Sequence, residues 1–208
     1  MTYLTVENCE RTVEIRRSEF ITIVRHVTSE EELFVELNAI RKKYSDATHV
    51  CYASVFDASG NGARFSDDGE PSGTAGAPIL DAIKGAGIRE VLVAVVRYFG
   101  GIKLGAGGLV RAYSSSASDA LKSAKKLICE PTDYYQLVLD FSTAKKVTSA
   151  IIKSGIRIEN TEYSSSVTLT LAVLSGIEIT ATLADILGAK PNLTFIKSGY
   201  SQRPSMEN

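Results

Sequence analysis

Hydrophobic and polar residues alternate along the first part of the chain with the period expected of strands. The alternation covers residues 12–15 and 20–27, and the short polar stretch RRS between them predicts a tight turn. From residue 29 to 44, apolar residues recur every three or four positions, which predicts a helix with one buried face. Ser29 and Glu32 begin that segment in an S-x-x-E arrangement, which is typical of a helix capping box.

The next part of the chain alternates strands with helices. Residues 49–56 predict a strand, and residues 63–66 predict its hairpin partner. A helix is predicted over residues 75–86, where glycines mark the end of the apolar pattern. Residues 90–98 include the run EVLVAVV, which is typical of a central strand buried on both faces. A glycine-rich loop then leads into a helix predicted over residues 109–127.

The pattern changes near residues 130–132, where a proline interrupts and glycines become less frequent. The elements predicted beyond this point are a strand at 135–141, a helix at 143–154, strands at 157–163 and 167–173, a helix at 176–187 and a strand at 193–199. That β-α-β-β-α-β order is typical of the ferredoxin-like fold. The sequence therefore predicts an α+β protein of two domains, residues 1–131 and residues 132–208.

Charge and cysteine content narrow the classes of function. Lys and Arg total 23 against 24 Asp and Glu, so only a local basic patch is expected as a nucleic-acid interface. Cys9, Cys51 and Cys129 are too few and too scattered for a disulfide framework or a zinc site, and suit a reducing compartment. Since no signal peptide or membrane span is recognisable, a cytoplasmic location without a membrane partner is expected.

Ten of the 16 glycines lie between residues 69 and 108. Two loops in this stretch run into predicted helix N-termini: the first loop is DDGEPSGT at residues 67–74, and the second loop is FGGIKLGAGG at residues 99–108. Free N–H groups and the helix dipole at such N-termini favour anions. Lys103 lies in the second loop, and Arg97 and Arg111 lie on either side of it. We therefore expect a cradle for an anion or a phosphate, formed by Ser72, Gly73, Thr74, Gly76, Arg97, Gly100, Gly101, Lys103, Gly105, Gly107, Gly108 and Arg111.

The loops do not match a standard nucleotide-binding motif. The second loop lacks the terminal Lys-Ser/Thr pair of a P-loop, and no acidic residue follows at the distance expected of a Rossmann fingerprint. The alternative to an anion site is that the glycines only permit tight turns and close packing of helix on sheet. Both interpretations are open at the level of sequence.

The first loop contains three acidic residues, Asp67, Asp68 and Glu70, which precede the helix predicted over residues 75–86. Three carboxylates could hold Mg²⁺ beside a bound phosphate or act as acid and base. The structural interpretation is favoured, because Asp in turns bonds its own backbone, and Ser72 or Thr74 would cap the following helix. No metal or other cofactor is expected.

His49 and Cys51 lie on one face of a predicted strand, and no third group that would orient them as a nucleophilic pair is evident. Packing at the core or at the sheet edge is the better interpretation. Lys122, Lys125 and Lys126 lie at the end of the helix predicted over residues 109–127, where a solvated cap is favoured. If that face adjoined Lys103 and Arg111, the lysines would extend a basic stripe for RNA.

Two long motifs identify a family. SDDGEPSGTAGAPIL at residues 66–80 and VVRYFGGIKLGAGGLVRAY at residues 95–113 resemble the signatures of the YigZ/IMPACT family. The resemblance covers essentially the whole chain. It implies an IMPACT domain that is similar to the second domain of ribosomal protein S5, followed by the small ferredoxin-like domain of bacterial members. The family has no agreed reaction.

The resemblance also implies a link with the regulation of translation or of stress responses. Eukaryotic IMPACT proteins bind the activator of an amino-acid-starvation kinase and modulate translation initiation, but they carry a different N-terminal domain and lack this C-terminal part. A dipeptidase function is not expected here, because a two-metal peptidase site needs clustered His, Asp and Glu ligands that the sequence does not offer.

Three functions follow from these observations. The favoured one is a non-catalytic binding module whose glycine-rich loops hold RNA phosphate or another anionic partner. The second is a small enzyme acting on a phosphorylated metabolite, and the third is a protein–protein adaptor without an anion site. The expected partners are RNA, a ribosome-associated factor or a small anion, and the oligomeric state is left open.

Overall fold

The computed structural model describes residues 1–205, and within them the chain divides into two compact units. The N-terminal unit consists mainly of Tyr3–Ile128, together with the last described residues, which follow Gln202. The C-terminal unit consists mainly of Cys129–Gln202. Among the described helices, none is both long enough and apolar enough to cross a bilayer.

The N-terminal unit is built on a five-stranded sheet with the order β2-β3-β6-β4-β5, in which each strand is antiparallel to its neighbours. Its strands are β2 (Cys9–Ile15), β3 (Ser18–His26), β4 (His49–Val55), β5 (Ala63–Ser66) and β6 (Val91–Tyr98). Every predicted strand of this region is therefore present. A further short strand, β1 (Tyr3–Val6), was not predicted from the sequence.

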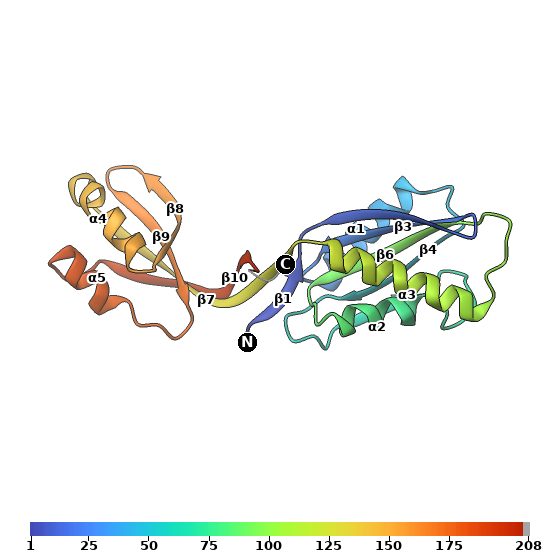
Figure 1. Cartoon of the computed structure of the whole chain (residues 1–208). Helices are drawn as coiled ribbons and strands as arrows, with labels where there is room; N and C mark the ends of the chain where they lie inside the picture. Colours follow the sequence, from blue (N-terminus) through green and yellow to red (C-terminus); the bar gives the residue numbers. More distant parts are fainter. Residues whose placement is uncertain (206–208) are drawn as a thin grey trace. The chain divides into compact units, whose positions relative to one another are not determined.

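The central strand β6 is buried on both faces, as its β-branched run predicted. Alternate residues from Val91 onward face helices α2 (Gly76–Gly85) and α3 (Ala106–Ser123), while Leu92 and its alternates face α1 (Glu30–Lys43). Figure 1 shows the resulting three layers, with α1 on one side of the sheet and α2 beside α3 on the other. Strands β3, β4 and β6 each contribute side chains to both faces, so the sheet separates two hydrophobic cores.

The capping box at the start of α1 forms with a changed partner. The Ser29 hydroxyl accepts a hydrogen bond from the Glu32 amide at 3.2 Å, as predicted. The Glu32 carboxylate, however, reaches back one residue further than expected and accepts from the Thr28 amide at 2.7 Å. The helix still begins where the motif indicated.

The turn between β2 and β3 contains two residues with left-handed backbone conformation. Arg16 and Arg17 have φ of 49° and 64°, which matches the twist of a two-residue hairpin. Neither residue is glycine, so the turn is strained, and it exposes two guanidinium groups. This turn packs closely against the second glycine-rich loop, because a Cβ on Gly100 would overlap the Arg17 carbonyl oxygen.

The C-terminal unit has the predicted β-α-β-β-α-β order, and the predicted α+β, two-domain fold class is confirmed. The elements are β7 (Lys126–Leu139), α4 (Phe141–Lys153), β8 (Arg157–Tyr163), β9 (Val167–Leu174), α5 (Thr180–Leu187) and β10 (Leu193–Pro204). In the second sheet β7 lies between β10 and β9, with β8 beyond β9, and β1 also pairs with β7. The core of this unit includes Leu137, Ile151, Leu169 and Leu183.

Several boundaries differ from the sequence prediction: α3 ends at Ser123 instead of residue 127, β7 begins at Lys126 instead of residue 135, and α5 begins at Thr180 instead of residue 176. Strand β7 runs through Pro131, where an interruption was expected, because a proline is tolerated where no ladder hydrogen bond needs its missing N–H. Helix α3 begins at Ala106, three residues earlier than predicted. Gly107 and Gly108 therefore belong to its first turn, where glycine is less costly than in a helix interior.

Candidate functional site

The two glycine-rich loops meet at a cavity in the N-terminal unit. The cavity has a volume of about 390 Å³ and lies where β4 begins, β6 ends and α3 begins. Apolar side chains form part of its wall. Its polar and aromatic lining includes Thr48, His49, Glu70, Arg97, Phe99 and Lys103, and the α3 N-terminus contributes Gly105 and Ala106.

A buried ion pair forms one wall of the cavity. Arg97 is 5% exposed, and its Nη1 lies 2.6 Å from Oε1 of Glu70, which is 8% exposed. The same oxygen accepts a hydrogen bond of 2.7 Å from the Tyr113 hydroxyl of α3. Glu70 therefore ties the first loop to β6 and to α3. Arg97 Nη2 contacts Ser18 Oγ at 3.4 Å, whereas its buried Nε has no hydrogen-bond partner among the described residues.

His49 lies beside this ion pair. Its Nδ1 is 2.8 Å from the Asp68 carbonyl oxygen, which can only accept, so Nδ1 carries a proton. Its Nε2 lies 3.9 Å from Glu70 Oε1, and the ring lines the cavity. The sequence interpretation of His49 as a packing residue did not foresee this position.

Cys51 does not line the cavity and is not placed to act as a nucleophile there. The thiol is fully buried and donates to the Asp67 carbonyl oxygen at 3.0 Å. Burial raises the pKa of Cys51 to about 12, and the nearby charge of Glu70 acts in the same direction. Burial likewise raises the pKa of the Tyr113 hydroxyl. Both groups therefore stay protonated at neutral pH and act as hydrogen-bond donors.

In the first loop, the Asp67 carboxylate fills the N-terminus of α2. It accepts hydrogen bonds from the amides of Gly73 at 2.8 Å, Ala75 at 3.0 Å and Gly76 at 2.8 Å. Burial alone would raise the pKa of Asp67, but these three amides outweigh it and hold the pKa below its usual value. Amides that were expected to face an external anion are thus occupied from within the chain.

The prediction that Ser72 or Thr74 caps α2 is wrong. The residue at the N-cap position of α2 is Ala75, and it makes no side-chain cap hydrogen bond. The Thr74 hydroxyl instead donates to the Pro71 carbonyl oxygen at 2.6 Å. Gly76 is required for a different reason, since a Cβ there would lie 2.9 Å from the Ser66 backbone.

The other acidic residue of the first loop also has partners within the chain. Asp68 Oδ2 accepts from the Val50 amide at 2.7 Å, and Oδ1 lies 3.4 Å from Arg41 Nη2. Each of the three carboxylates thus bonds to backbone amides or to basic or phenolic side chains. Within residues 1–205, no cluster of three or more His, Cys, Asp and Glu side chains could hold a metal ion.

The second loop leaves its helix N-terminus without an internal side-chain cap. The N-cap residue of α3 is Gly105, with φ of 70°, and no side chain of residues 1–205 caps the first amides of the helix. Two hydrogen bonds fix the start of the loop. The Phe99 amide donates to Thr48 Oγ1 at 3.2 Å, and the Gly100 amide donates to Ser18 Oγ at 3.3 Å.

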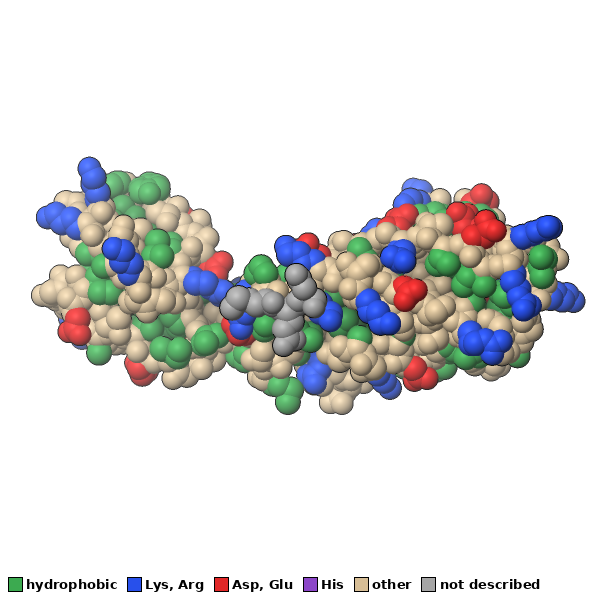
Figure 2. Space-filling view, viewed as in Figure 1, with side chains coloured by type: hydrophobic (Ala, Val, Ile, Leu, Met, Phe, Trp, Pro, Cys, Tyr) green, Lys and Arg blue, Asp and Glu red, His purple; other side chains and the backbone are tan. Residues whose placement is uncertain are grey.

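Arg111 lies in a smaller, neighbouring cavity of about 200 Å³ with Arg16. Leu104 lines both cavities. Neither guanidinium forms an ion pair with another described residue. Figure 2 shows Lys and Arg side chains at the end of this unit where the β2–β3 turn and the start of α3 lie in Figure 1.

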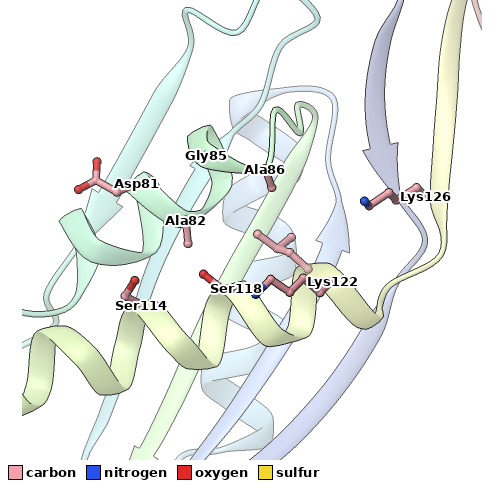
Figure 3. A pocket seen from close by; sticks show the side chains of 9 residues that line it. Asp81, Ala82, Gly85, Ala86, Ser114, Ser118, Lys122 and Lys126 are labelled. Carbon is pink, nitrogen blue, oxygen red and sulfur yellow. The ribbon is translucent and has the colours of Figure 1, made fainter. Parts of the chain in front are cut away.

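Lys122 and Lys126 line a separate cavity of about 420 Å³ between α2 and α3. Figure 3 shows Ser114 and Ser118 of α3 pointing toward α2, and Lys126 pointing toward the C-terminal end of α2. Because α3 rises about 1.5 Å per residue, Lys122 lies about 16 Å along the helix from Arg111. These lysines therefore line a different cavity from Lys103 and Arg111, near the other end of α3.

The structure thus divides the predicted site residues. Arg97, Lys103 and Gly105 line the main cavity, whereas Arg111 and Gly108 line its neighbour. Gly107 lies between them in the first turn of α3, and Gly100 and Gly101 belong to the loop that leads there. Gly73 and Gly76 bond to Asp67. Sequence reasoning did not single out Phe99 or Tyr113, although both fall within the second family motif.

Comparisons with known proteins place the chain in a family. Residues 16–121 match the model of the Impact N-terminal domain. The chain is 36% identical over 176 residues to the IMPACT family member YigZ of Escherichia coli, covering 83% of this chain and 86% of that protein. It is 34% identical over 93 residues to the Protein IMPACT homolog of Saccharomyces cerevisiae, covering 43% of this chain and 36% of that protein.

Among solved structures, the crystal structure of a hypothetical protein superposes on this fold. The two chains are 32% identical with a TM-score of 0.63, and the match covers 94% of this chain and 98% of that one. The similarity to YigZ extends over four fifths of the chain, and both signature motifs lie within the region that the domain model matches. The chain belongs to the IMPACT family.

Proposed function

We propose that the N-terminal unit is a non-catalytic binding module that holds a phosphate group of RNA, or of another anionic partner, in the cavity at the start of α3. One observation carries this proposal: a buried arginine lies in the same cavity as Lys103 and the N-terminus of α3, and among residues 1–205 its Nε has no hydrogen-bond partner and the helix has no side-chain cap. Unpaired N–H donors and a helix dipole favour negative charge.

The cation content of the cavity favours an anionic ligand. Glu70 is the acidic residue that lines it, and its Oε1 already accepts from Arg97 and Tyr113. Lys103 is exposed and forms no ion pair with a described residue, so its charge is available to a ligand. A phosphate oxygen can accept from several donors at once, which suits this set.

The test is a titration of ¹⁵N-labelled protein with pyrophosphate, followed through the backbone amides. We expect the amide resonances of Ala106, Gly107 and Gly108 to shift. Lys103→Glu should weaken binding at least tenfold, whereas Lys84→Glu, an exposed lysine in the last turn of α2, should leave it unchanged. Absence of shifts at the α3 amides, or equal effects of the two variants, would contradict the proposal.

The link with translation or stress regulation is part of the same proposal. It is supported by membership of the IMPACT family, whose relatives include the yeast IMPACT homolog. We expect the protein to cosediment with ribosomes or RNA at low salt and to dissociate as salt rises, because phosphate contacts release counterions. Cosedimentation that is equal for the native protein and Lys103→Glu would argue against it.

A second candidate function is a small enzyme acting on a phosphorylated metabolite, and His49 favours it. The Asp68 carbonyl oxygen orients the ring so that Nε2 lies toward Glu70 at the cavity, as a general acid or base requires. This function predicts turnover of a phosphate ester that is lost in His49→Gln with folding intact. A screen of phosphorylated metabolites without turnover would exclude it.

A further inference from the structure

The main cavity contains an aromatic platform beside its cations. Phe99 is 46% exposed and lines the cavity, and the Arg97 guanidinium lies 5.6 Å from the centre of its ring. The backbone under the ring is fixed, because the Phe99 amide bonds to Thr48 and the next amide bonds to Ser18. An exposed aromatic ring on a fixed backbone loses little conformational freedom when a ligand stacks on it.

The neighbouring cavity has a different character. Its volume is about 200 Å³, half that of the main cavity, and it presents Arg16 and Arg111 without an aromatic side chain. Two guanidinium groups with no ion-pair partner among the described residues suit a phosphate group rather than a base. Since Leu104 lines both cavities, a ligand passing over this side chain would meet the aromatic site first and the arginine site next.

We propose that these two cavities are adjacent subsites for single-stranded nucleic acid. This proposal rests on the proposed phosphate-binding function and names its ligand. One base stacks on Phe99, its phosphate lies at Lys103 and the first amides of α3, and the next phosphate lies between Arg16 and Arg111. The ligand is at least two nucleotides long.

A single strand suits this arrangement better than a duplex does. The ring of Phe99 can stack only on a base that is free of the helical stack, and aromatic stacking with little sequence preference is typical of single-strand binding. The net charge of −1 offers no broad basic surface of the kind that holds duplex backbone over many phosphates. Cations confined to two small cavities match a short stretch of strand instead.

The experiment compares three probes on the full chain: pyrophosphate, uridine monophosphate and hexauridylate. We expect hexauridylate to bind at least tenfold more tightly than the monophosphate, because only the longer probe reaches both subsites. Phe99→Ala should weaken hexauridylate binding about tenfold, because it removes the ring on which a base stacks, and should weaken pyrophosphate binding much less. Phe99→Tyr should restore the affinity.

Two matched controls separate the subsites from general effects. Phe65→Ala removes an exposed phenylalanine of β5 that does not line either cavity, and it should leave all three affinities unchanged. Arg111→Ala should weaken hexauridylate several-fold and leave the monophosphate unaffected. Folding of each variant is verified by its urea unfolding midpoint.

The outcomes distinguish the two proposals. If pyrophosphate binds but hexauridylate is no tighter than the monophosphate, or Phe99→Ala behaves as Phe65→Ala, the single-strand inference fails and the phosphate site stands. If pyrophosphate does not bind, both fail. Equal affinity for hexaglutamate and hexauridylate would also overturn the inference, since an acidic peptide offers charge without a base to stack.

Discussion

The two glycine-rich loops of the N-terminal unit both lead into helix starts, but they differ in whether a side chain of the loop caps the helix N-terminus. In the first loop, Asp67 turns its carboxylate onto three amides around the start of α2. In the second, Gly105 precedes α3, and no side chain of residues 1–205 caps that helix. One loop supplies its own anion, whereas the other leaves the first amides of its helix without a side-chain acceptor among the described residues.

The difference shows that glycine content alone does not distinguish a loop whose helix start is capped from within the chain from one whose helix start is left uncapped. The deciding feature is whether an acidic side chain earlier in the loop accepts hydrogen bonds from the amides at the helix start. The first loop has such a residue six to nine positions before the amides that it binds. The second loop, FGGIKLG, contains no acidic residue, and its one charged residue is Lys103.

The largest effect is expected where Glu70 ties the first loop to β6 and α3. Glu70→Gln should lower the free energy of unfolding by about 3 kcal/mol, because it leaves the buried Arg97 guanidinium without a charged partner. Urea unfolding measures this. Glu31→Gln, an exposed residue of α1, should change the value by less than about 0.5 kcal/mol. A similar small effect for Glu70→Gln would mean that this ion pair does not hold the first loop on β6.

Within the second loop, two glycines should respond differently to alanine. Gly100→Ala should cost about 2–3 kcal/mol, because the added methyl group overlaps the Arg17 carbonyl oxygen. Gly105→Ala should cost about 1–2 kcal/mol, from the positive φ alone, because no heavy atom lies within 4 Å of the new Cβ. Thermal unfolding of the two variants checks the order, and equal costs would contradict the contact with the hairpin turn.

Removing the internal cap should make the first loop resemble the second. Asp67→Ala should lower stability by about 1–2 kcal/mol, since three amides lose their acceptor. Added sulfate should then stabilise the variant more than the native protein, and calorimetry in sulfate and chloride measures the difference. Asp119→Ala, an exposed residue of α3, is the matched control. An identical response to sulfate in native protein and Asp67→Ala would count against an anion-like role of the carboxylate.

The smallest effect is a dependence on pH. The pKa of Asp67 is lowered in the folded state, so its contribution to stability is present above the unfolded pKa of about 3.9 and is lost as pH falls through the folded value. The stability difference between native protein and Asp67→Asn should therefore shrink as pH falls below about 4. Urea unfolding from pH 7 to pH 2 measures it. A difference that stays constant over this range would show that the charge does not contribute.

Local patterns predicted most of the fold. The EVLVAVV run predicted a central strand because burial on both faces removes polar alternation, and Ser29 marked the start of α1 because a cap acts within one turn. The failures share a cause. The cap of α2 comes from Asp67 across a loop, and β7 passes through Pro131 because its pairing does not need that N–H. Neither fact is local in sequence.

The candidate site was predicted in part for the same reason. Helix starts and nearby cations can be recognised from short motifs, so Arg97 and Lys103 were identified. The position of His49 depends on the Asp68 carbonyl oxygen, 19 residues away, and that of Tyr113 depends on Glu70, 43 residues away. Such pairs form only when loop, strand and helix are assembled.

Strand β6 has a consequence for how the N-terminal unit folds. Since Val93 faces one core and Leu92 the other, neither helical layer can bury its apolar surface until this strand is paired on both sides. Unfolding should therefore be cooperative, with loss of both layers in one transition. The β6 amides should exchange their hydrogens last, only when the whole unit opens.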